Sequence, residues 1–312
     1  MSIKDELLKS LPFVETELDL LIWSAPQRYK TYFIKKRHLG QYREVSQPTP
    51  EIKLLQRWLV ERVLRKFPVH ACAKAYKCGS GLIENVQPHS NHRFLLKIDF
   101  ENFFPSIKAE HFFSFSTDAG ETEEDSNLMC QVLFKRTKGM RSLNLAIGAP
   151  SSPHLSNILL YKLDSAISEA ANKENITYTR YADDLSFSTS EPGMLTTFEK
   201  KIPDLINKNC EIPLKLNRQK TVHASKKNGR RITGLVITPQ GSISIGLDRK
   251  KLLRAQIYRF SKGELSDDST QSLKGYLAYL ASVESDHLVR LARYYGTDIM
   301  HQLYPAIFSL LR

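Results

Sequence analysis

The chain has 312 residues, of which 41% are hydrophobic and 25% charged. That length favours two or three packed subdomains over one simple core, and the composition is typical of a globular protein. The sequence contains no run of 18 consecutive apolar residues, and its acidic, interrupted N-terminal segment is unlike a secretory signal. We therefore expect a cytoplasmic protein that does not contact a membrane.

Basic side chains outnumber acidic ones by 45 to 33, which gives a formal net charge of +12. The excess is concentrated in three stretches without any acidic residue: Arg28 to Arg43, Lys215 to Arg231 and Arg249 to Lys262. Tyr and Phe are interleaved in the first and the third. One such stretch is usually just a solvated face, but three of them favour a surface that binds nucleic acid.

The cysteines are Cys72, Cys78, Cys130 and Cys210, and no two of them form a CxxC pair. The usual spacing of a structural zinc site is therefore absent. A site built from Cys72 and Cys78 with His70, His89 and His92 is the less favoured alternative. We expect reduced thiols, in keeping with a cytosolic protein.

The first third of the chain has apolar residues at helical spacing in the segments 7–11, 18–22 and 54–63. Between the last two, YKTYFIKKRHLGQYREVSQP (29–48) alternates and predicts a basic hairpin closed by Pro48. RFLLKIDF (93–100) predicts a short apolar strand that ends at Asp99, and a new element starts at Pro105.

The middle of the chain begins with ETEEDSN (121–127), whose polar composition predicts a loop. We then expect helices around Leu128 to Phe134, from His154 to about Ala171, and near Met194 to Asn207. RRITGLVI (230–237) and GSISIGL (241–247) predict two strands of a hairpin, and the tail from Asp248 is mainly helical. These elements predict a mixed α/β architecture with a helical end.

Two adjacent carboxylates lie between two apolar runs in YTRYADDLSF (178–187), which predicts a hairpin with Asp183 and Asp184 at its tip. A plain Asp-Asp turn is the alternative for this segment taken alone. Asp99 ends another strand, and three carboxylates at strand ends would form an oxygen-rich site for hard divalent cations. Two Mg²⁺ ions there could activate a hydroxyl and stabilise a leaving phosphate.

An ordered set of motifs resembles the palm of a reverse transcriptase: FLLKIDFENFFPS, then GAPSSPHLSN, then YADD with its flanking strands. The match runs from about Arg28 to Leu235. NVQPH (85–89) and RRITGLV (230–236) resemble elements of retron reverse transcriptases in particular, with Ile232 where those enzymes have Val.

The resemblance implies an α/β (α+β) right-hand polymerase, with an antiparallel palm sheet that carries the YADD hairpin. Its fingers would comprise 1–95 with an N-terminal helical extension. The palm would comprise 96–235 with a fingers insertion at about 106–145, and the helical thumb 236–312.

The resemblance also implies roles for individual residues. Asp99 and Asp183 would be the principal metal ligands, with Asp184 in support and the Phe100 carbonyl completing one of two Mg²⁺ sites. The nucleotide-binding residues would be Lys36, Arg43, Phe104, Gly148, Ala149, Pro150 and Lys220, with Phe104 as the steric gate against a 2′-OH. Ile147 stands where many reverse transcriptases have Gln, so no side-chain hydrogen bond to nucleic acid is expected there. The RNA-binding residues would be Asn85, His89, Arg230, Arg231, Thr233, Gly234, Lys250, Arg254 and Arg259, although Asn85 and His89 could instead form a hydrogen-bonded pair within a loop.

A retron enzyme would copy part of its own non-coding RNA into DNA from deoxynucleoside triphosphates. It would prime from the 2′-OH of a guanosine, leave a branched RNA–DNA hybrid called msDNA, and act with an effector protein in antiphage defence. A group II intron-type or diversity-generating reverse transcriptase is the alternative with the same chemistry. A non-enzymatic RNA-binding scaffold would lack at least one carboxylate, whereas Asp99, Asp183 and Asp184 are all present.

Overall fold

The protein is described by a computed structural model that covers residues 2–35, 40, 42–77, 79–137, 139 and 142–311. The chain folds into two compact units. Unit 1 comprises Met1–Gly79, Lys97–Phe187 and Gly193–Val222, and unit 2 comprises Ser80–Leu96, Ser188–Pro192 and His223–Arg312. The boundaries expected for fingers, palm and thumb concern polymerase subdomains and stay a prediction.

The elements of unit 1 are α1 (Ile3–Ser10), α2 (Glu15–Ser24), β1 (Tyr29–Lys35), β2 (Tyr42–Pro48), α3 (Pro50–Arg62), α5 (Phe103–Ser106), α6 (Ala109–Asp118), α7 (Glu123–Leu133), β4 (Lys135–Arg136), β5 (Leu143–Asn144), α8 (Ser152–Leu159), α9 (Tyr161–Lys173), β6 (Thr177–Tyr181), α10 (Met194–Glu199), α11 (Ile202–Asn209) and β8 (Lys215–Leu216). Those of unit 2 are α4 (Leu82–Val86), β10 (Arg230–Ile232), β11 (Leu235–Ile237), β12 (Ile243–Ser244), α12 (Leu247–Ser261), α13 (Asp267–Val283), α14 (Ser285–Tyr295), α15 (Thr297–Leu303) and α16 (Ile307–Leu311). The unit boundaries fall within β3 (Phe94–Glu101), β7 (Asp184–Thr189) and β9 (Val222–Ser225).

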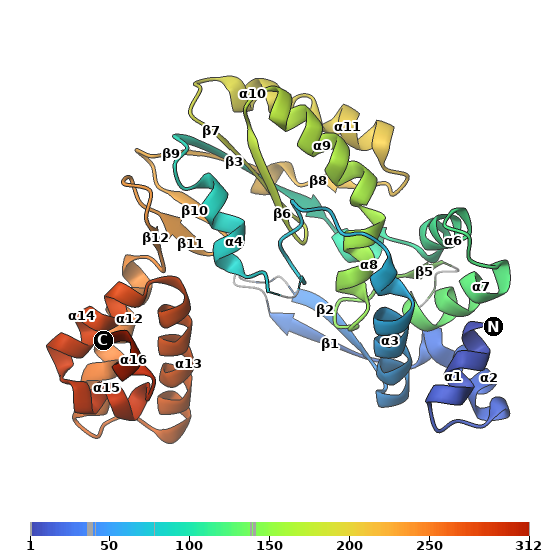
Figure 1. Ribbon diagram of the computed structural model, residues 1–312, viewed down its shortest axis with the longest axis horizontal. Coiled ribbons are helices and arrows are strands. Elements are labelled where there is room, and N and C mark those ends of the chain that lie inside the picture. The colour runs from blue at the N-terminus through green and yellow to red at the C-terminus, as the bar shows by residue number, and fades with distance from the viewer. Residues whose placement is uncertain are drawn as a thin grey trace. The chain divides into compact units, whose positions relative to one another are not determined.

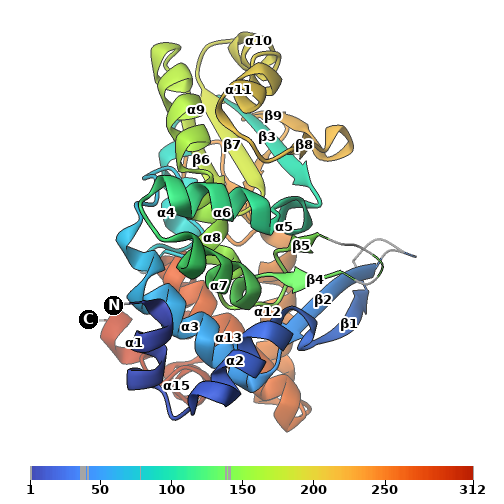
Figure 2. The same ribbon diagram turned by 90° about the vertical axis from the view of Figure 1, so that its right-hand side faces the viewer.

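The predicted basic hairpin is confirmed. Strands β1 and β2 pair antiparallel from Tyr29 opposite Pro48 to Lys35 opposite Tyr42. Helices α1, α2 and α3 lie beside α7 in the same part of unit 1 (Figure 2). The hairpin follows directly from the alternating pattern in the sequence.

The prediction of a loop at 121–127 is wrong, because α7 begins at Glu123. Thr122 is its N-cap and accepts a hydrogen bond from the Asp125 backbone, and three acidic residues in the first turn complement the positive end of the helix dipole. The acidic, polar composition that predicts a loop here is also typical of the first turn of a helix.

Two helices expected to be continuous are each broken in two. The segment from His154 to Ala171 divides into α8 and α9 at Leu160, and the segment near Met194 to Asn207 divides into α10 and α11. Pro203 lies in the first turn of α11, where a ring without an N–H is tolerated. The helical character of both segments is confirmed, and their continuity is wrong.

A central sheet has the strand order β6-β7-β3-β8, with β9 also paired to β3. Helices α9 and α11 pack against each other beside this sheet (Figure 1). Tyr178 stacks on Phe187 with ring centroids 4.8 Å apart, and Phe187 contacts Phe198 of α10 at 5.4 Å. Buried aromatic contacts therefore fix the strands that carry the double aspartate.

Unit 2 combines a small sheet, in the order β10-β11-β12, with the helices α12 to α16. The expected two-strand hairpin is wrong in detail, because RRITGLVI itself folds back between β10 and β11. The turn consists of Thr233 at φ +45° and Gly234 at φ +84°, the left-handed pair that a tight two-residue hairpin requires. The helical tail is confirmed, and its buried leucines form one core with β10 and β11.

Candidate active site

The double aspartate lies where the sheet places it beside Asp99. Strands β6 and β7 form the predicted hairpin, joined through Ala182 and Asp183, and Asp184 is the first residue of β7. Ala182 adopts φ +57°, which makes the turn tight. The Phe100 N–H donates to the Asp183 carbonyl at 3.1 Å. The neighbouring strand β3 therefore holds Asp99 and Phe100 against the turn.

The Asp99 carboxylate is buried, and its cationic partner among the described residues is Lys220. The Lys220 ammonium donates to both carboxylate oxygens, at 2.8 and 3.0 Å. Lys220 ends the 3₁₀ helix Arg218–Lys220, and the preceding Asn217 N–H donates to the Asp99 carbonyl at 2.7 Å. The LNRQKT segment (216–221) is thus attached to β3 at Asp99, through both the backbone and the carboxylate.

For Asp183 and Asp184, the effect of burial outweighs that of the nearby cations Lys97 and Lys220. Burial, and then the neighbouring Asp184, raise the pKa of Asp183 to about 6. Burial also raises the pKa of Asp184, and the charge of Asp99 acts on both carboxyls in the same direction. The three carboxylates predicted to converge are therefore close enough to repel one another.

The donor set consists of carboxylate oxygens in a partly buried site, which are the ligands that hard divalent cations prefer. The neighbouring negative charges of Asp183 and Asp184, and an ammonium already held by Asp99, fit a site that attracts cations. Within the described ranges, no group of three or more His, Cys, Asp or Glu side chains is arranged so that it could hold a metal ion. The carboxylates thus fit a cation by chemistry and location, and their assignment as ligands stays a prediction.

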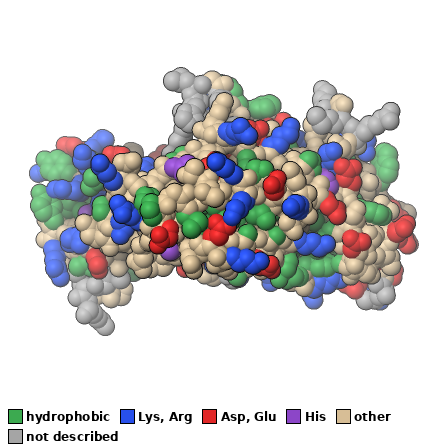
Figure 3. Space-filling view, turned by 90° about the horizontal axis from the view of Figure 1, so that it is seen from above, with side chains coloured by type: hydrophobic (Ala, Val, Ile, Leu, Met, Phe, Trp, Pro, Cys, Tyr) green, Lys and Arg blue, Asp and Glu red, His purple; other side chains and the backbone are tan. Residues whose placement is uncertain are grey.

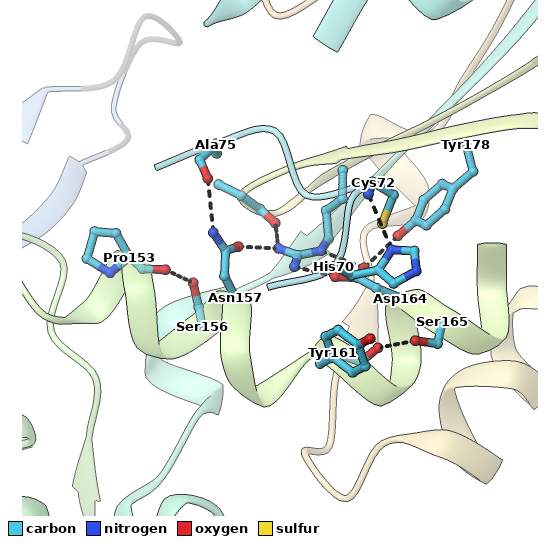
Figure 4. A network of polar contacts seen from close by, with 12 residues as sticks. His70, Cys72, Ala75, Pro153, Ser156, Asn157, Tyr161, Asp164, Ser165 and Tyr178 are labelled. Atoms are coloured by element: carbon cyan, nitrogen blue, oxygen red, sulfur yellow. Dashed lines mark hydrogen bonds and ion pairs between the residues drawn. The ribbon is translucent and has the colours of Figure 1, made fainter. Parts of the chain in front are cut away.

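A buried polar network lies directly behind the turn (Figure 4). The Arg180 guanidinium donates to both oxygens of Asp164 in α9, at 2.8 and 2.6 Å, and Tyr178 donates to the same carboxylate at 3.0 Å. The guanidinium also reaches Asn157 Oδ1 at 3.1 Å and the Ala182 carbonyl at 3.0 Å. One fully buried cation therefore ties α8, α9 and the turn before Asp183 together.

Two of the segments expected to bind the nucleotide, the β1–β2 hairpin and the GAPSSP loop (148–153), lie against each other. Lys36 lies outside the described residues, and Arg43 is exposed on β2. Gly148 adopts φ +108°, and a Cβ there would lie 2.9 Å from Val45 Cγ1 and 3.1 Å from the Ser46 carbonyl. The Ser46 N–H donates to the Ile147 carbonyl at 2.7 Å. Only glycine therefore lets the GAPSSP loop approach the hairpin that carries Arg43.

The other predicted nucleotide residues line the same part of unit 1. Ala149 is buried and Pro150 half-buried just before α8. Phe104 is half-buried in α5, and its ring contacts that of Phe103 at 5.2 Å. Lys220 is the lysine already placed on Asp99.

Comparison with known proteins adds the decisive observation. Residues 34–237 match the family model described as reverse transcriptase (RNA-dependent DNA polymerase). The chain is 34% identical to the retron Ec83 reverse transcriptase of Escherichia coli, across 97% of both chains. It is 32% identical to the retron Ec86 reverse transcriptase of Escherichia coli over 90% of this chain and 84% of that one, and 31% identical to the retron Ec73 enzyme over 89% and 90%. The chain belongs to the retron reverse transcriptases.

It follows that this reverse transcriptase is an RNA-directed DNA polymerase with the right-hand polymerase fold, as the motifs predicted. An RNA template and nucleotides are its partners, and enzymes of the family use divalent metal ions. No helix in the described ranges is long and apolar enough to cross a membrane.

Three of the predicted RNA-binding residues of the reverse transcriptase are buried in unit 2. Asn85 and His89 are almost completely enclosed, and His89 Nδ1 lies 2.7 Å from the Ser188 hydroxyl. Arg230 is 1% exposed, and its guanidinium donates to backbone carbonyls of Ser90 at 3.1 Å, of Thr238 at 2.8 Å and of His92. These side chains can act on RNA only through the segments they hold.

The remaining predicted RNA-binding residues are more accessible. Arg231, Arg254 and Arg259 are exposed, and Lys250 is partly buried beside Glu284. Thr233 and Gly234 form the tight turn, and the Arg249 guanidinium donates to the Gly234 carbonyl at 3.2 Å. On the face shown in Figure 3, Lys and Arg side chains lie among acidic and hydrophobic ones and form no uninterrupted basic patch.

Sequence reasoning missed the network around Arg180. The available signal was a charged residue in the middle of the apolar strand TYTRY. Asp164 gave a second one, because it lies at helical spacing among the buried Leu163 and Ile167 of α9. Of the cysteines, Cys72, Cys130 and Cys210 form no disulfide, and Cys78 lies outside the described residues.

Proposed function

We propose that this reverse transcriptase copies part of a cognate non-coding RNA into DNA and primes from the 2′-OH of a guanosine in that RNA. The product would be branched msDNA. The observation that supports the proposal is that the charge of Asp99 acts on both Asp183 and Asp184, in a chain that matches the retron Ec83 enzyme along 97% of its length. A group II intron-like or diversity-generating enzyme would share the carboxylates but not this likeness.

In the proposed mechanism, the three carboxylates and the Phe100 carbonyl would hold two Mg²⁺ ions. Bound cations supply activation of the attacking hydroxyl and stabilisation of charge on the phosphate. Arg43, with Lys36, would bind the triphosphate, since a guanidinium matches phosphate geometry. The GAPSSP backbone from Gly148 to Pro150 would shape the nucleotide pocket. Lys220 would leave Asp99 to contact pyrophosphate.

Phe104 is proposed as the steric gate. It follows Asp99 closely in the chain and its half-buried ring is braced by Phe103. Phe104→Ala should admit ribonucleotides, and this can be measured by the ratio of kcat/KM for a deoxynucleotide and its ribonucleotide. An unchanged ratio would remove Phe104 as the gate.

The proposal includes the fingers at 1–95, the palm at 96–235 with an insertion at about 106–145, and the thumb at 236–312. RNA binding would involve the region of Asn85 and His89, the turn from Arg230 to Gly234, and Lys250, Arg254 and Arg259 on α12. The exposure of Arg231, Arg254 and Arg259 supports this part.

The test is to express the protein with the DNA that flanks its gene and to extract the nucleic acid that co-purifies. The expected product is a DNA of discrete length, joined to RNA through a 2′,5′ linkage that a debranching enzyme cleaves. Asp183→Asn should yield RNA alone. Synthesis on an added template and primer without any branched product would instead support the group II intron-like or diversity-generating alternative.

Action with an effector protein in antiphage defence is the last part of the proposal, supported by membership of the retron enzymes. Cells that carry the gene with its flanking DNA should reduce phage plating, and Asp183→Asn should restore it. Equal plating with and without the wild-type locus would contradict a defence role.

A further inference from the structure

Tyr76 has an unfavourable backbone conformation next to the candidate active site. Its φ is +63°, in the left-handed region that bulky side chains rarely adopt, and 49% of the residue is exposed. Ala75 and Tyr76 lie in a turn, where a positive φ favours glycine, so neither the turn nor core packing explains a tyrosine here. Strain of this kind persists only where the surroundings enforce it, and it is concentrated at functional sites.

The buried network holds the backbone that leads to Tyr76. The segment before Tyr76 is tied to β6 by two hydrogen bonds of 2.8 Å, from the Arg180 N–H to the Cys72 carbonyl and from the Lys74 N–H to the Arg180 carbonyl. Asn157 of α8 donates its side-chain amide to the Ala75 carbonyl at 2.9 Å, and Arg180 in turn donates to Asn157 (Figure 4). The backbone up to Ala75 is therefore fixed from two sides.

The same hydrogen bonds place Tyr76 beside the turn that precedes Asp183, because Arg180 donates both to Asn157, which holds the Ala75 carbonyl, and to the Ala182 carbonyl. The charges of Asp183 and Arg43 act on the Tyr76 hydroxyl: after burial, which raises the pKa of Tyr76, Asp183 raises it further and Arg43 lowers it. Asp183 lies where the reacting phosphate would be held, and Arg43 is the residue proposed to bind the triphosphate. A ring at this place would line one side of a nucleotide bound between Asp183 and Arg43.

We propose that Tyr76 is a nucleotide-contacting residue whose ring face packs against the incoming deoxynucleotide, and that the Arg180–Asn157 network exists in part to hold it there. The inference rests on the proposed active site. It assigns a function to the strain, since a more relaxed backbone would direct the ring away from the substrate. An aromatic face binds every base in the same way, which suits an enzyme that must accept four nucleotides.

The test uses Tyr76→Gly, because glycine accepts the positive φ without strain while removing the ring. On a heteropolymeric RNA template with an annealed DNA primer, its KM for deoxynucleotides should rise about 5- to 100-fold, the range expected on losing a stacking partner. Its kcat should change less than about threefold and its Tm should not fall. Tyr76→Phe, which keeps the ring, should retain the wild-type KM.

Asn175→Gly is the matched control, because Asn175 also has a positive φ, +53°, and precedes the other end of β6. It should alter neither KM nor kcat. An unchanged KM in Tyr76→Gly, or an equal rise in Tyr76→Phe, would overturn the inference. Asp183→Asn separates the two levels: if that variant still synthesises DNA, the active-site assignment fails, whereas an inactive Asp183→Asn with a normal Tyr76→Gly removes only Tyr76.

Discussion

Strand β6 contains a buried charge that is paired with an opposite charge, whereas the turn that follows it contains two buried charges of the same sign. Arg180 is paired with both oxygens of Asp164 and is fully buried. Three residues later, Asp183 and Asp184 lie side by side, and burial raises their pKa values despite the opposing charges of Lys97 and Lys220. The difference separates charge that stabilises the fold around the site from charge that we propose for the reaction, and each can be tested by substituting one residue.

The largest effect is expected where the compensated charge loses its partner. Asp164→Asn leaves the Arg180 guanidinium buried without a counter-ion, so the free energy of unfolding should fall by about 3–5 kcal/mol. Urea denaturation followed by tryptophan fluorescence measures the change. The double variant Asp164→Leu with Arg180→Met removes both charges and should recover much of the loss. A fall below about 1 kcal/mol in the single variant would contradict the structural role of the pair.

Removing the charge of Asp183 should have the reverse effect on the free energy of unfolding. The folded-state pKa of Asp183 is about 6, above the ordinary 3.8, so ionising this carboxyl opposes folding at pH above 6 and the cost disappears below pH 3.8. Asp183→Asn should therefore stabilise the protein at pH 8 in a chelator by roughly 1–3 kcal/mol while abolishing DNA synthesis.

The pH dependence of this gain provides its check. The stability difference between Asp183→Asn and wild type should shrink as the pH falls from 6 towards 4, because the wild-type carboxyl becomes protonated. Asp118→Asn, at an exposed position on α6, is the control and should show no such gain. A destabilised Asp183→Asn at pH 8 would mean that the carboxylate is compensated after all.

The contrast also explains what the sequence could and could not predict. Asp99 and Asp183 were recognisable because strand and turn signals lie next to them in the chain. The Asp164–Arg180 pair joins residues 16 positions apart on a helix and a strand, so only the folded chain shows that both are buried and in contact. The start of α7 was missed for a local reason, since acidic residues after Thr122 are as common in loops as in first helical turns.

Tertiary packing also reversed the expected accessibility of particular residues. His89 and Arg230 are polar and belong to motifs that suggest RNA contact, yet both are buried in unit 2. Arg231, the next residue, is exposed because successive side chains of a strand point to opposite faces. A motif predicts that a residue matters, and the alternation of the strand decides whether its side chain reaches solvent.

Arg230 offers a sharper version of the comparison, because its guanidinium is held by backbone carbonyls and by no carboxylate among its described contacts. Arg230→Met should cost about 1–3 kcal/mol, through carbonyls left without a donor, and should leave the salt dependence of RNA binding unchanged. Arg231→Ala should do the opposite, with little loss of stability and a salt slope flatter by ~0.7 if it contacts single-stranded RNA. Equal salt slopes for the wild type, Arg230→Met and Arg231→Ala would place the RNA away from β10.

The smallest expected effect concerns the turn after β10. Thr233 is β-branched, has φ +45°, and its buried hydroxyl has no hydrogen-bond partner among the described residues. Asn is favoured before Gly in this type of turn, so Thr233→Asn should stabilise the protein by ~0.5–1 kcal/mol, measured by urea denaturation. Gly234→Ala should have the opposite effect and destabilise the protein. The added Cβ would lie 3.2 Å from the Arg249 guanidinium, and the φ at this position disfavours alanine. If Thr233 is retained for RNA contact, the more stable Thr233→Asn protein should bind its RNA more weakly; equal or tighter binding would leave the strain at this turn without a function in recognition.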